Sequence, residues 1–344
     1  MKNIPIEKDC AFLITDRLTR KYLSGVDIAD GFLILGKRMV AFTDARYFYA
    51  AKQTFQKVGI DCYLYKGVES LGEYLKEIGA KTLLLDYDKT TLKEYGVYKN
   101  FGLNIADGSA LIEKARSVKD ERELDCIKRA CMIAQKAYHE ALKFVKKGIS
   151  EIQLRDKIEA LILSYGADEV AFDTIVAFGE NAAVPHHETG ETVLTDNQVI
   201  LVDMGCKVNG YCSDLTRTAF FGNPDVKFLS AYSAVLNANE LAEENIFSTL
   251  SAKAADGIAR DFLSENGYGE YFTHSLGHGV GLEIHEYPTL SPRSNAVLTE
   301  NMVFTVEPGV YFDGEFGIRI EDTVLIKNGK VERLFTDDKR LLIL

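Results

Sequence analysis

Two aspartates lie on opposite arms of a predicted β-hairpin over residues 198–222. Asn209-Gly210 stands between two β-rich runs, a pattern typical of a two-residue type I′ turn. This turn pairs Asp203 with Thr216 and places Asp203 and Asp214 on one face, because strand side chains alternate. As diagonal neighbours, their Cβ atoms would lie about 7–8 Å apart. Two carboxylates in an apolar surrounding repel each other and lose solvation, so they need a cation.

Two other interpretations apply to the same hairpin. The aspartates could be solvated side chains on the open face of a sheet. Cys206 points away from the aspartates and Cys212 toward them, so we expect no disulfide between the two cysteines. A metal ligand and a small buried residue are the alternatives for Cys212, and we expect the second.

A second dense segment, HSLGHGVGLEIH, covers residues 274–285 and holds three histidines and three glycines. Glycine lets the backbone pass close to other groups, so this composition favours a site over separate core or surface histidines. Val184-Pro185-His186-His187 adds two more histidines on a constrained loop. For either of these two alone, an ordinary structural role is the simpler interpretation.

Two glutamates mark a second hairpin, MVFTVEPGVYFDGEFGIRIEDTVLI, over residues 302–326. A three-residue loop centred on Gly314 would place Glu307 opposite Glu321, although Pro308 interrupts the ladder. The alternative for Glu307 is a strand-end charge in solvent. An acidic residue between an apolar strand and a Pro-Gly break favours a functional role.

These segments together offer four carboxylates and one imidazole: Asp203, Asp214, His278, Glu307 and Glu321. A set rich in oxygen suits two divalent ions, and Mn²⁺ better than a thiolate-bound structural Zn²⁺. Two metals about 3.5–4 Å apart can hold a bridging hydroxide and polarise a carbonyl, which is the pattern of metal-assisted amide hydrolysis.

The surrounding pattern predicts two kinds of architecture. The first part reads as a mixed α/β domain, with a hairpin at 32–36 and 39–43, strands at 62–65 and 82–86, and helices near 46–57, 68–78 and 89–99. The polar stretch 113–120 marks a change, with Ser117 and Asp120 resembling a capping box.

Beyond that point the pattern indicates an α+β domain. A long helix should run to Gly148, and Ser150 should cap another that stops near Gly166. Further helices are expected near 226–249 and 252–265, and strands at 172–178, 198–222, 302–312 and 317–327.

Composition excludes several classes of protein. The 344 residues suggest about two domains and carry a net charge of −11, divided as +3 on residues 1–117 and −14 on residues 118–344. This acidity argues against a nucleic-acid or anionic-membrane binder. The absence of an apolar start, of a long apolar run and of any CxxC pair predicts a cytoplasmic protein with reduced cysteines.

Residues 118–344 resemble the metallopeptidases of the pita-bread fold, which include methionine aminopeptidase, aminopeptidase P and prolidase. The matching pieces are LVDMG with SDLTRT, HSLGHGVGLEIHE, FTVEPGVY and GIRIEDTV, in the family's order. The resemblance implies an α+β pita-bread catalytic domain behind an α/β N-terminal domain. It carries the family's metal ligands over to Asp203, Asp214, His278, Glu307 and Glu321.

The resemblance also implies roles for other residues. His186, seventeen residues before Asp203, and His285 would contact the substrate and steady the tetrahedral intermediate. Glu307 would also shuttle the proton. Arg319 matches an arginine near the site, and His274 matches a histidine beside the metal cleft.

The presence of an N-terminal domain distinguishes some members of the family from others. Methionine aminopeptidases usually lack it, whereas prolidases and aminopeptidases P carry one, and TDARYF at 43–48 looks like theirs. The expectation is therefore a dinuclear hydrolase of Xaa-Pro bonds that uses Mn²⁺, with Co²⁺ or Zn²⁺ possible. Its substrate would be a small peptide with proline second, and the leading domain would wall the cleft and build a homodimer.

Three rival interpretations exist, and the presence of all five ligand residues argues against the first two. A creatinase-like enzyme would hydrolyse without metals and lack the full ligand set. A non-catalytic binding protein on the same scaffold would have lost ligands, and a methionine aminopeptidase-like enzyme would have another specificity. Between prolidase and aminopeptidase P, the short chain favours the smaller prolidase-like enzymes. Arg293 and Arg319 are the candidate cations for a dipeptide's free carboxylate.

Overall fold

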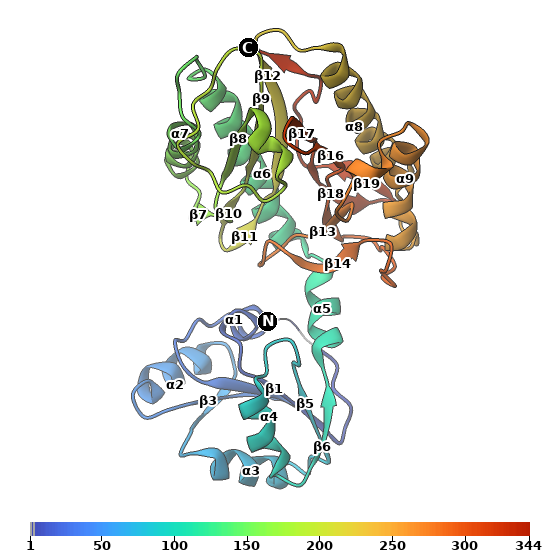
Figure 1. Ribbon diagram of the computed structural model, residues 1–344. Coiled ribbons are helices and arrows are strands. Elements are labelled where there is room, and N and C mark those ends of the chain that lie inside the picture. The colour runs from blue at the N-terminus through green and yellow to red at the C-terminus, as the bar shows by residue number, and fades with distance from the viewer. Residues whose placement is uncertain (1, 3) are drawn as a thin grey trace. The chain divides into compact units, whose positions relative to one another are not determined.

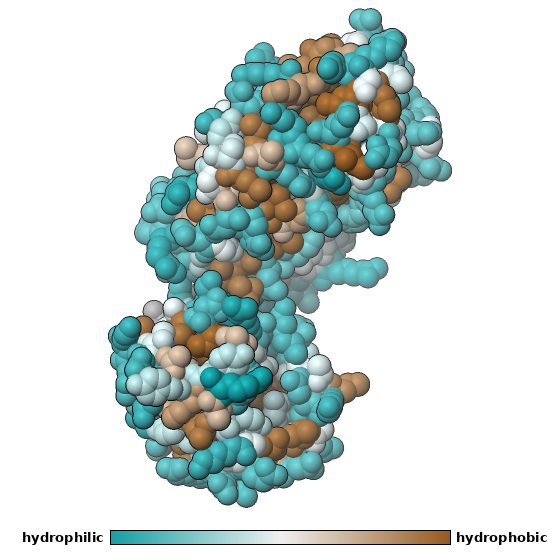
Figure 2. Space-filling view, turned by 90° about the vertical axis from the view of Figure 1, so that its left-hand side faces the viewer, coloured by the Kyte–Doolittle hydropathy of each residue, from teal (hydrophilic) through white to brown (hydrophobic). Residues whose placement is uncertain are grey.

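The computed structural model describes residue 2 and residues 4–344. The chain divides into two compact units, Met1–Arg116 and Ser117–Leu344. Figure 1 shows the first unit in blue to cyan and the second in green to red. The face of each unit in Figure 2 is mostly hydrophilic, with patches of hydrophobic residues between. Within the described residues, no helix is long and apolar enough to cross a membrane.

A six-stranded mixed sheet forms the centre of the N-terminal unit, with strand order β4-β3-β2-β1-β5-β6. Its strands are β1 (Cys10–Ile14), β2 (Phe32–Leu35), β3 (Met39–Thr43), β4 (Asp61–Leu64), β5 (Thr82–Leu85) and β6 (Asn104–Asp107). The predicted hairpin is confirmed as the antiparallel pair of β2 and β3, while β4, β5 and β6 pair in parallel with their neighbours.

Helices cover both faces of this sheet. They are α1 (Arg17–Ser24), α2 (Phe48–Lys57), α3 (Val68–Glu77), α4 (Leu92–Lys99) and α5 (Ser109–Ser117). One apolar cluster joins Phe12 to side chains of α1, α2 and α5, and a second joins Leu13 to side chains of α3 and α4. Because both faces are buried, the central strands read as continuous apolar runs rather than as alternating ones.

The predicted capping box at Ser117 is wrong. Ser117 ends α5, and Asp120 caps the next helix, α6 (Glu121–Leu142). The Asp120 carboxylate accepts a hydrogen bond from the Glu123 backbone N–H, and the Glu123 carboxylate accepts one from the Asp120 N–H. Glu123 thus supplies the second hydrogen bond of a capping box that begins at Asp120 instead of Ser117. Helix α6 also ends before the predicted Gly148, and β1, α1, β6 and α5 were not predicted.

The C-terminal unit holds the longer helices. They are α6, α7 (Glu151–Ser164), α8 (Val226–Asn245) and α9 (Ala252–Glu265), with short 3₁₀ turns η1 (Gly179–Ala183) and η2 (Gly269–Tyr271). The Ser150 side chain caps α7 as predicted, in a capping box with Gln153.

Four groups of strands complete this unit. A four-stranded sheet contains β20 (Leu342–Ile343), β12 (Leu215–Phe221), β9 (Gln198–Met204) and β8 (Ile175–Phe178). A five-stranded sheet contains β14 (Glu286–Leu290), β13 (Gly277–Gly279), β15 (Val303–Val306), β18 (Asp322–Lys327) and β19 (Lys330–Arg333). The smaller groups are β11 (Tyr211–Cys212), β10 (Cys206–Val208) and β7 (Glu169–Val170), and the pair β16 (Gly309–Phe312) and β17 (Phe316–Arg319).

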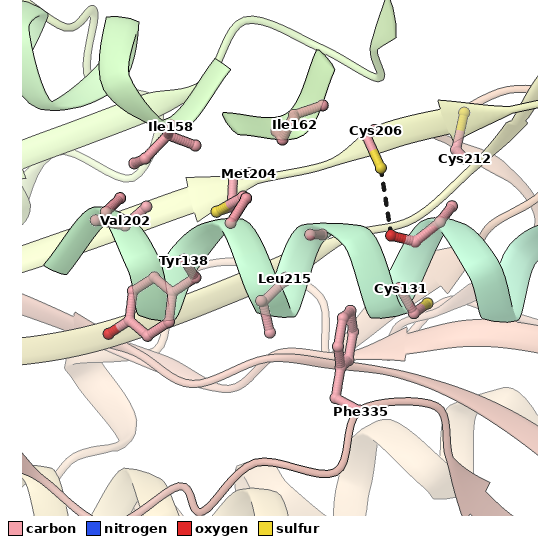
Figure 3. Packing of buried hydrophobic residues seen from close by; sticks show 14 of the residues in the cluster. Cys131, Tyr138, Ile158, Ile162, Val202, Met204, Cys206, Cys212, Leu215 and Phe335 are labelled. Atoms are coloured by element: carbon pink, nitrogen blue, oxygen red, sulfur yellow. Dashed lines mark hydrogen bonds between the residues drawn. The ribbon is translucent and has the colours of Figure 1, made fainter. Parts of the chain in front are cut away.

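Two apolar clusters support these sheets. The first joins α6 and α7 to inward side chains of the strands, and Figure 3 shows α6 lying along Met204, Cys206 and Leu215. The Cys206 thiol donates to the Ala130 carbonyl, and Cys212 is fully buried in the same cluster. All six cysteines are free, so the expected absence of a 206–212 disulfide is confirmed. The second cluster joins α8 and α9 to the other side.

The register of the aspartate hairpin follows the prediction. Asn209 and Gly210 have φ values of 51° and 83°, as a type I′ turn requires. Thr216 lies opposite Asp203, and Tyr211 lies opposite Val208. No residue is inserted between the two arms, so the predicted alternation holds through to the aspartates.

The glutamate hairpin also keeps its predicted register. Phe312 pairs with Phe316 around Gly314, whose φ is 69°, and Gly309 pairs with Arg319. Beyond Pro308 the pairing resumes with Val306 opposite Asp322, so 307 and 321 face each other across the break. The two hairpins then join, because the Glu321 N–H donates to the Thr216 carbonyl.

Candidate metal centre and active site

A pocket of about 520 Å³ lies in the C-terminal unit where the two hairpins meet the histidine segment. Nine of the side chains singled out from the sequence line it: His186, Asp203, Asp214, His274, His278, His285, Glu307, Arg319 and Glu321. Arg293, the other candidate cation, is exposed and is not among the residues that line this pocket.

Different strands, and residues directly beside strand ends, supply the metal-ligand candidates. Asp203 lies on β9, Asp214 directly precedes β12, and His278 lies on β13. Glu307 directly follows β15 and Glu321 directly precedes β18. Side chains within strands and directly beside strand ends thus converge on one pocket.

Glycine is required beside His278. A Cβ atom on Gly277 would lie 2.0 Å from the Thr305 carbonyl oxygen, so no other residue fits without moving a neighbouring strand. The Thr305 hydroxyl accepts from the His278 N–H and donates to the Glu307 carboxylate. The glycine-rich composition thus brings the histidine strand against the glutamate strand, as the sequence indicated.

Three of the candidates form a compact group. Ligand atoms of Asp214, His278 and Glu321 all lie within 4.8 Å of one another. The His278 Nε2 atom lies 3.6 Å from an Asp214 oxygen and 3.4 Å from a Glu307 oxygen. Asp203 is outside this tight group but lines the same pocket.

Burial and mutual repulsion raise the pKa of the carboxyl groups. Burial is the largest cause for Asp214, and the charges of Glu321 and Asp203 add to it, so its pKa lies well above the usual range. Burial, then the Glu307 charge, likewise raises the pKa of Glu321. Burial raises the pKa of Glu307 to about 7. The positively charged side chains of the pocket therefore do not balance the negative charge of its carboxylates.

The same side chains fit a divalent cation. Glu321 Oε1 and Asp203 Oδ1 are buried and have no hydrogen-bond partner. A buried carboxylate oxygen without a donor is costly unless a cation binds it. Burial also lowers the pKa of His278, which keeps the imidazole neutral and able to donate a lone pair to a metal.

Arg319 balances part of this negative charge. Its Nη2 donates to Asp203 Oδ2 at 2.7 Å, and its Nε donates to the Thr216 hydroxyl at 3.1 Å. Thr216 in turn donates to Glu321 at 2.6 Å. The third guanidinium nitrogen donates to the Tyr311 hydroxyl at 2.8 Å. Arg319 therefore orients Asp203 directly and Glu321 through Thr216, while its third nitrogen binds Tyr311.

Tyr311 is a pocket residue that the sequence reasoning missed. Its hydroxyl lies 3.0 Å from His274 Nε2 as well as beside Arg319. Burial, then the charge of Arg319, lowers the pKa of His274 to about 4, so its ring is neutral. The available signal was a tyrosine in an otherwise apolar strand, since a buried tyrosyl hydroxyl usually finds a partner.

The two adjacent histidines face different surroundings. His186 lines the pocket, as does His285, whose ring centre lies 4.2 Å from that of His278. The His187 Nε2 instead lies 2.9 Å from a carboxylate oxygen of Glu151. This difference matches the preference for His186 that the seventeen-residue spacing to Asp203 indicated.

Comparisons with known proteins match both units. Residues 125–328 match the model of metallopeptidase family M24, and residues 7–118 match the creatinase/prolidase N-terminal domain. An uncharacterized peptidase of Bacillus subtilis is 34% identical, with 96% of this chain and 95% of the relative covered.

Solved structures are similar over almost the whole chain. An Xaa-Pro dipeptidase from Bacillus anthracis has a TM-score of 0.91 and 36% identity, with 97% of this chain and 95% of that chain covered. An X-Pro aminopeptidase from Thermotoga maritima has a TM-score of 0.85 and 34% identity, with 97% of both chains covered. The α/β plus pita-bread architecture expected from the motifs is thereby confirmed.

Proposed function

The chain belongs to metallopeptidase family M24, and from this membership we propose that it hydrolyses Xaa-Pro bonds in small peptides with two divalent metal ions. One observation supports the chemistry above all: the five proposed ligands, four carboxylates and an imidazole, line one pocket, and two of the buried carboxylate oxygens have no partner. The similar Xaa-Pro dipeptidase and X-Pro aminopeptidase supply the substrate class of the proposal.

The proposed ligands are Asp203, Asp214, His278, Glu307 and Glu321. Four oxygen donors and one nitrogen donor suit Mn²⁺, and Co²⁺ or Zn²⁺ are the alternatives. When bound, two such ions would supply an activated water and polarise the scissile carbonyl.

Side chains of the protein would carry out the proton transfers of the reaction. Glu307 accepts a proton from the attacking water and delivers it to the prolyl nitrogen, which must be protonated before it can leave. Its carboxylate is oriented for this by the Thr305 hydroxyl at 3.1 Å.

Two histidines would stabilise the reacting carbonyl. His186 and His285 lie on the wall of the pocket and can donate to the oxygen on which negative charge develops. His274, with its neutral ring held by Tyr311, would contact the substrate beside Arg319. Phe172, Ile175 and Ile284 line the same pocket and offer an apolar surface to the pyrrolidine ring.

Metal content and substrate choice test the proposal together. Protein purified without chelator should hold about two Mn-like ions per chain and hydrolyse Xaa-Pro faster than the matching Xaa-Ala peptide. Removal of the metal should abolish turnover, and added Mn²⁺ should restore it more fully than Co²⁺ or Zn²⁺. A chain that binds no divalent ion at any supplied concentration, or that cleaves no Xaa-Pro peptide when loaded, would contradict the proposal.

We propose dipeptides as the preferred substrates, because the similar Bacillus anthracis structure, with a TM-score of 0.91, is that of an Xaa-Pro dipeptidase. Comparison of Ala-Pro with Ala-Pro-Yaa-Yaa separates the two specificities. A higher kcat/KM for the dipeptide is expected. Preference for the longer peptide would identify an aminopeptidase P instead.

We further propose that residues 1–117 form an accessory domain, that residues 118–344 are catalytic, and that the protein acts as a cytoplasmic homodimer. Within the described residues, the candidate metal-binding group lies in the second unit alone. Six free cysteines are typical of a reducing compartment. Sedimentation equilibrium should give twice the mass of one chain, and a monomer at micromolar concentration would refute the dimer.

A further inference from the structure

Glu151 is a fully buried carboxylate outside the catalytic pocket. It is the first residue of α7 and accepts four hydrogen bonds. The donors are the Phe178 N–H and the Asn181 side-chain amide at 2.8 Å, His187 Nε2 at 2.9 Å and the Gly190 N–H at 3.0 Å. A carboxylate only accepts, so His187 Nε2 carries the proton in this contact.

All four donors belong to one stretch of chain, residues 178–190, and His186 lies inside it. Glu151 therefore ties the stretch at its start, at its middle and at its end. The backbone adds to this, since the Ile152 N–H donates to the Gly190 carbonyl. A second anchor acts directly before His186, where Arg319 donates to the Pro185 carbonyl at 3.4 Å.

The two adjacent histidine side chains therefore lie in different surroundings. The His187 ring is held by Glu151, which itself has no exposed surface. The His186 side chain lines the catalytic pocket. Without the His187 contact the stretch would still be held by the Arg319 contact at Pro185 and by the other donors to Glu151, but the residue next to His186 would lose its side-chain anchor.

We propose that Glu151 and His187 are a positioning pair that fixes residues 178–190 so that His186 points at the substrate carbonyl. His187 is a positioning residue and does not touch the substrate. The inference rests on the proposed function for its kinetic consequence, but the geometry of the His186 ring can be measured without turnover.

Two substitutions at one position separate hydrogen bonding from packing. In His187→Gln the side-chain amide can still donate to Glu151, whereas His187→Leu fills similar space without a donor. We expect kcat of His187→Leu to fall about 10- to 100-fold, since small misplacements of a reacting group have effects of this order. His187→Gln should stay within about threefold of the parent. Lys143→Leu, at an exposed lysine just after α6 that pairs with Glu140, is the control and should leave kcat unchanged.

A double-mutant cycle tests whether His187 acts through His186. In a His186→Ala background, His187→Leu should cause little further loss, because the group that it positions is already absent. An equal loss in both backgrounds would overturn the inference and indicate a general structural role. A His187→Leu protein with the kcat of the parent would overturn it as well.

A spectroscopic measurement keeps the inference separate from the proposed activity. In ¹⁵N-histidine spectra of the full chain, the His186 signal is assigned by its loss in His186→Ala. It should shift in His187→Leu and stay in place in His187→Gln. An unmoved His186 signal in His187→Leu would refute the positioning pair even if no Xaa-Pro peptide were cleaved, whereas a shifted signal without activity would refute only the proposed function.

Discussion

Glu321→Gln should abolish hydrolysis and, at the same time, make the metal-free protein more stable. Loss of even an outer partner of a metal ligand typically costs about 10–100-fold in affinity or activity, so loss of a ligand itself should exceed about 100-fold. In the metal-free chain the same substitution removes a buried carboxyl group whose charged form Glu307 and Asp203 both repel. Catalysis and stability therefore change in opposite directions.

The stability gain should depend on pH in a defined direction. The folded-state pKa of Glu321 is raised above its unfolded value, so metal-free wild type is most stable below the unfolded pKa and loses stability as pH rises toward the folded pKa. The free energy of unfolding falls by about 1.4 kcal/mol for each pH unit between these two pKa values. Glu321→Gln lacks this loss, so its advantage should be larger at pH 8 than at pH 5.

Thermal unfolding with and without Mn²⁺ measures both effects. Metal should raise the Tm of wild type and should leave that of Glu321→Gln almost unchanged. Glu332→Gln is the control, because Glu332 lies on the neighbouring strand β19 but its side chain is 46% exposed. A metal-free Glu321→Gln that melts below wild type, with a normal response to Mn²⁺, would show that Glu321 is not part of a cation site.

Arg217→Met should cause the largest loss of stability in the C-terminal unit. The Arg217 side chain is 4% exposed and binds Asp337 through two nitrogens, each at 2.8 Å. It also donates to Asp322 at 2.7 Å and to the Glu321 carbonyl. Removing one member of a buried ion pair typically costs about 3–5 kcal/mol, because the partner stays buried without compensation.

This substitution should also weaken the metal site. Burial acts to raise the pKa of Asp322, but Arg217, Lys339 and Arg333 together hold it below its usual range. The network thus ties residues 333–339 of the chain to the backbone of Glu321. We expect Arg217→Met to lower metal affinity about 10–100-fold, in line with other outer partners of ligands.

Urea unfolding and competitive metal titration check these two effects. Arg217→Lys keeps one positive charge and should give an intermediate result. Arg340→Met is the matched control, since Arg340 pairs with Asp338 in the same segment but its side chain is 84% exposed. An Arg217→Met protein that unfolds at the same urea concentration as Arg340→Met would show that the buried network contributes nothing to stability.

Local rules accounted for the two hairpins. An Asn-Gly turn and the two-residue period of a strand suffice to place Asp203 and Asp214 on one face, and both arms keep this register. A three-residue loop at Gly314 likewise placed 307 opposite 321. These predictions held because turn type and alternation depend only on neighbouring residues.

The sequence predictions were wrong where one local signal is compatible with more than one structure. Ser117 and Asp120 both look like helix starts, and the choice depends on the helix α5 that precedes them. That helix follows strand β6, which lies at the edge of the sheet and has no fully buried residue to mark it. Strands of this kind have no apolar pattern to identify them.

The sequence by itself determined the register of each hairpin and the family, and it supplied the candidate ligands. Only the tertiary structure decided how these pieces meet: Glu321 beside Thr216, Arg319 on Asp203, and His187 turned to Glu151 while its neighbour lines the pocket. The physical reason is the separation along the sequence between the residues that interact. Turns and alternation are set by residues a few positions apart, whereas these contacts join residues 36 to 116 positions apart and form only when both cores have packed.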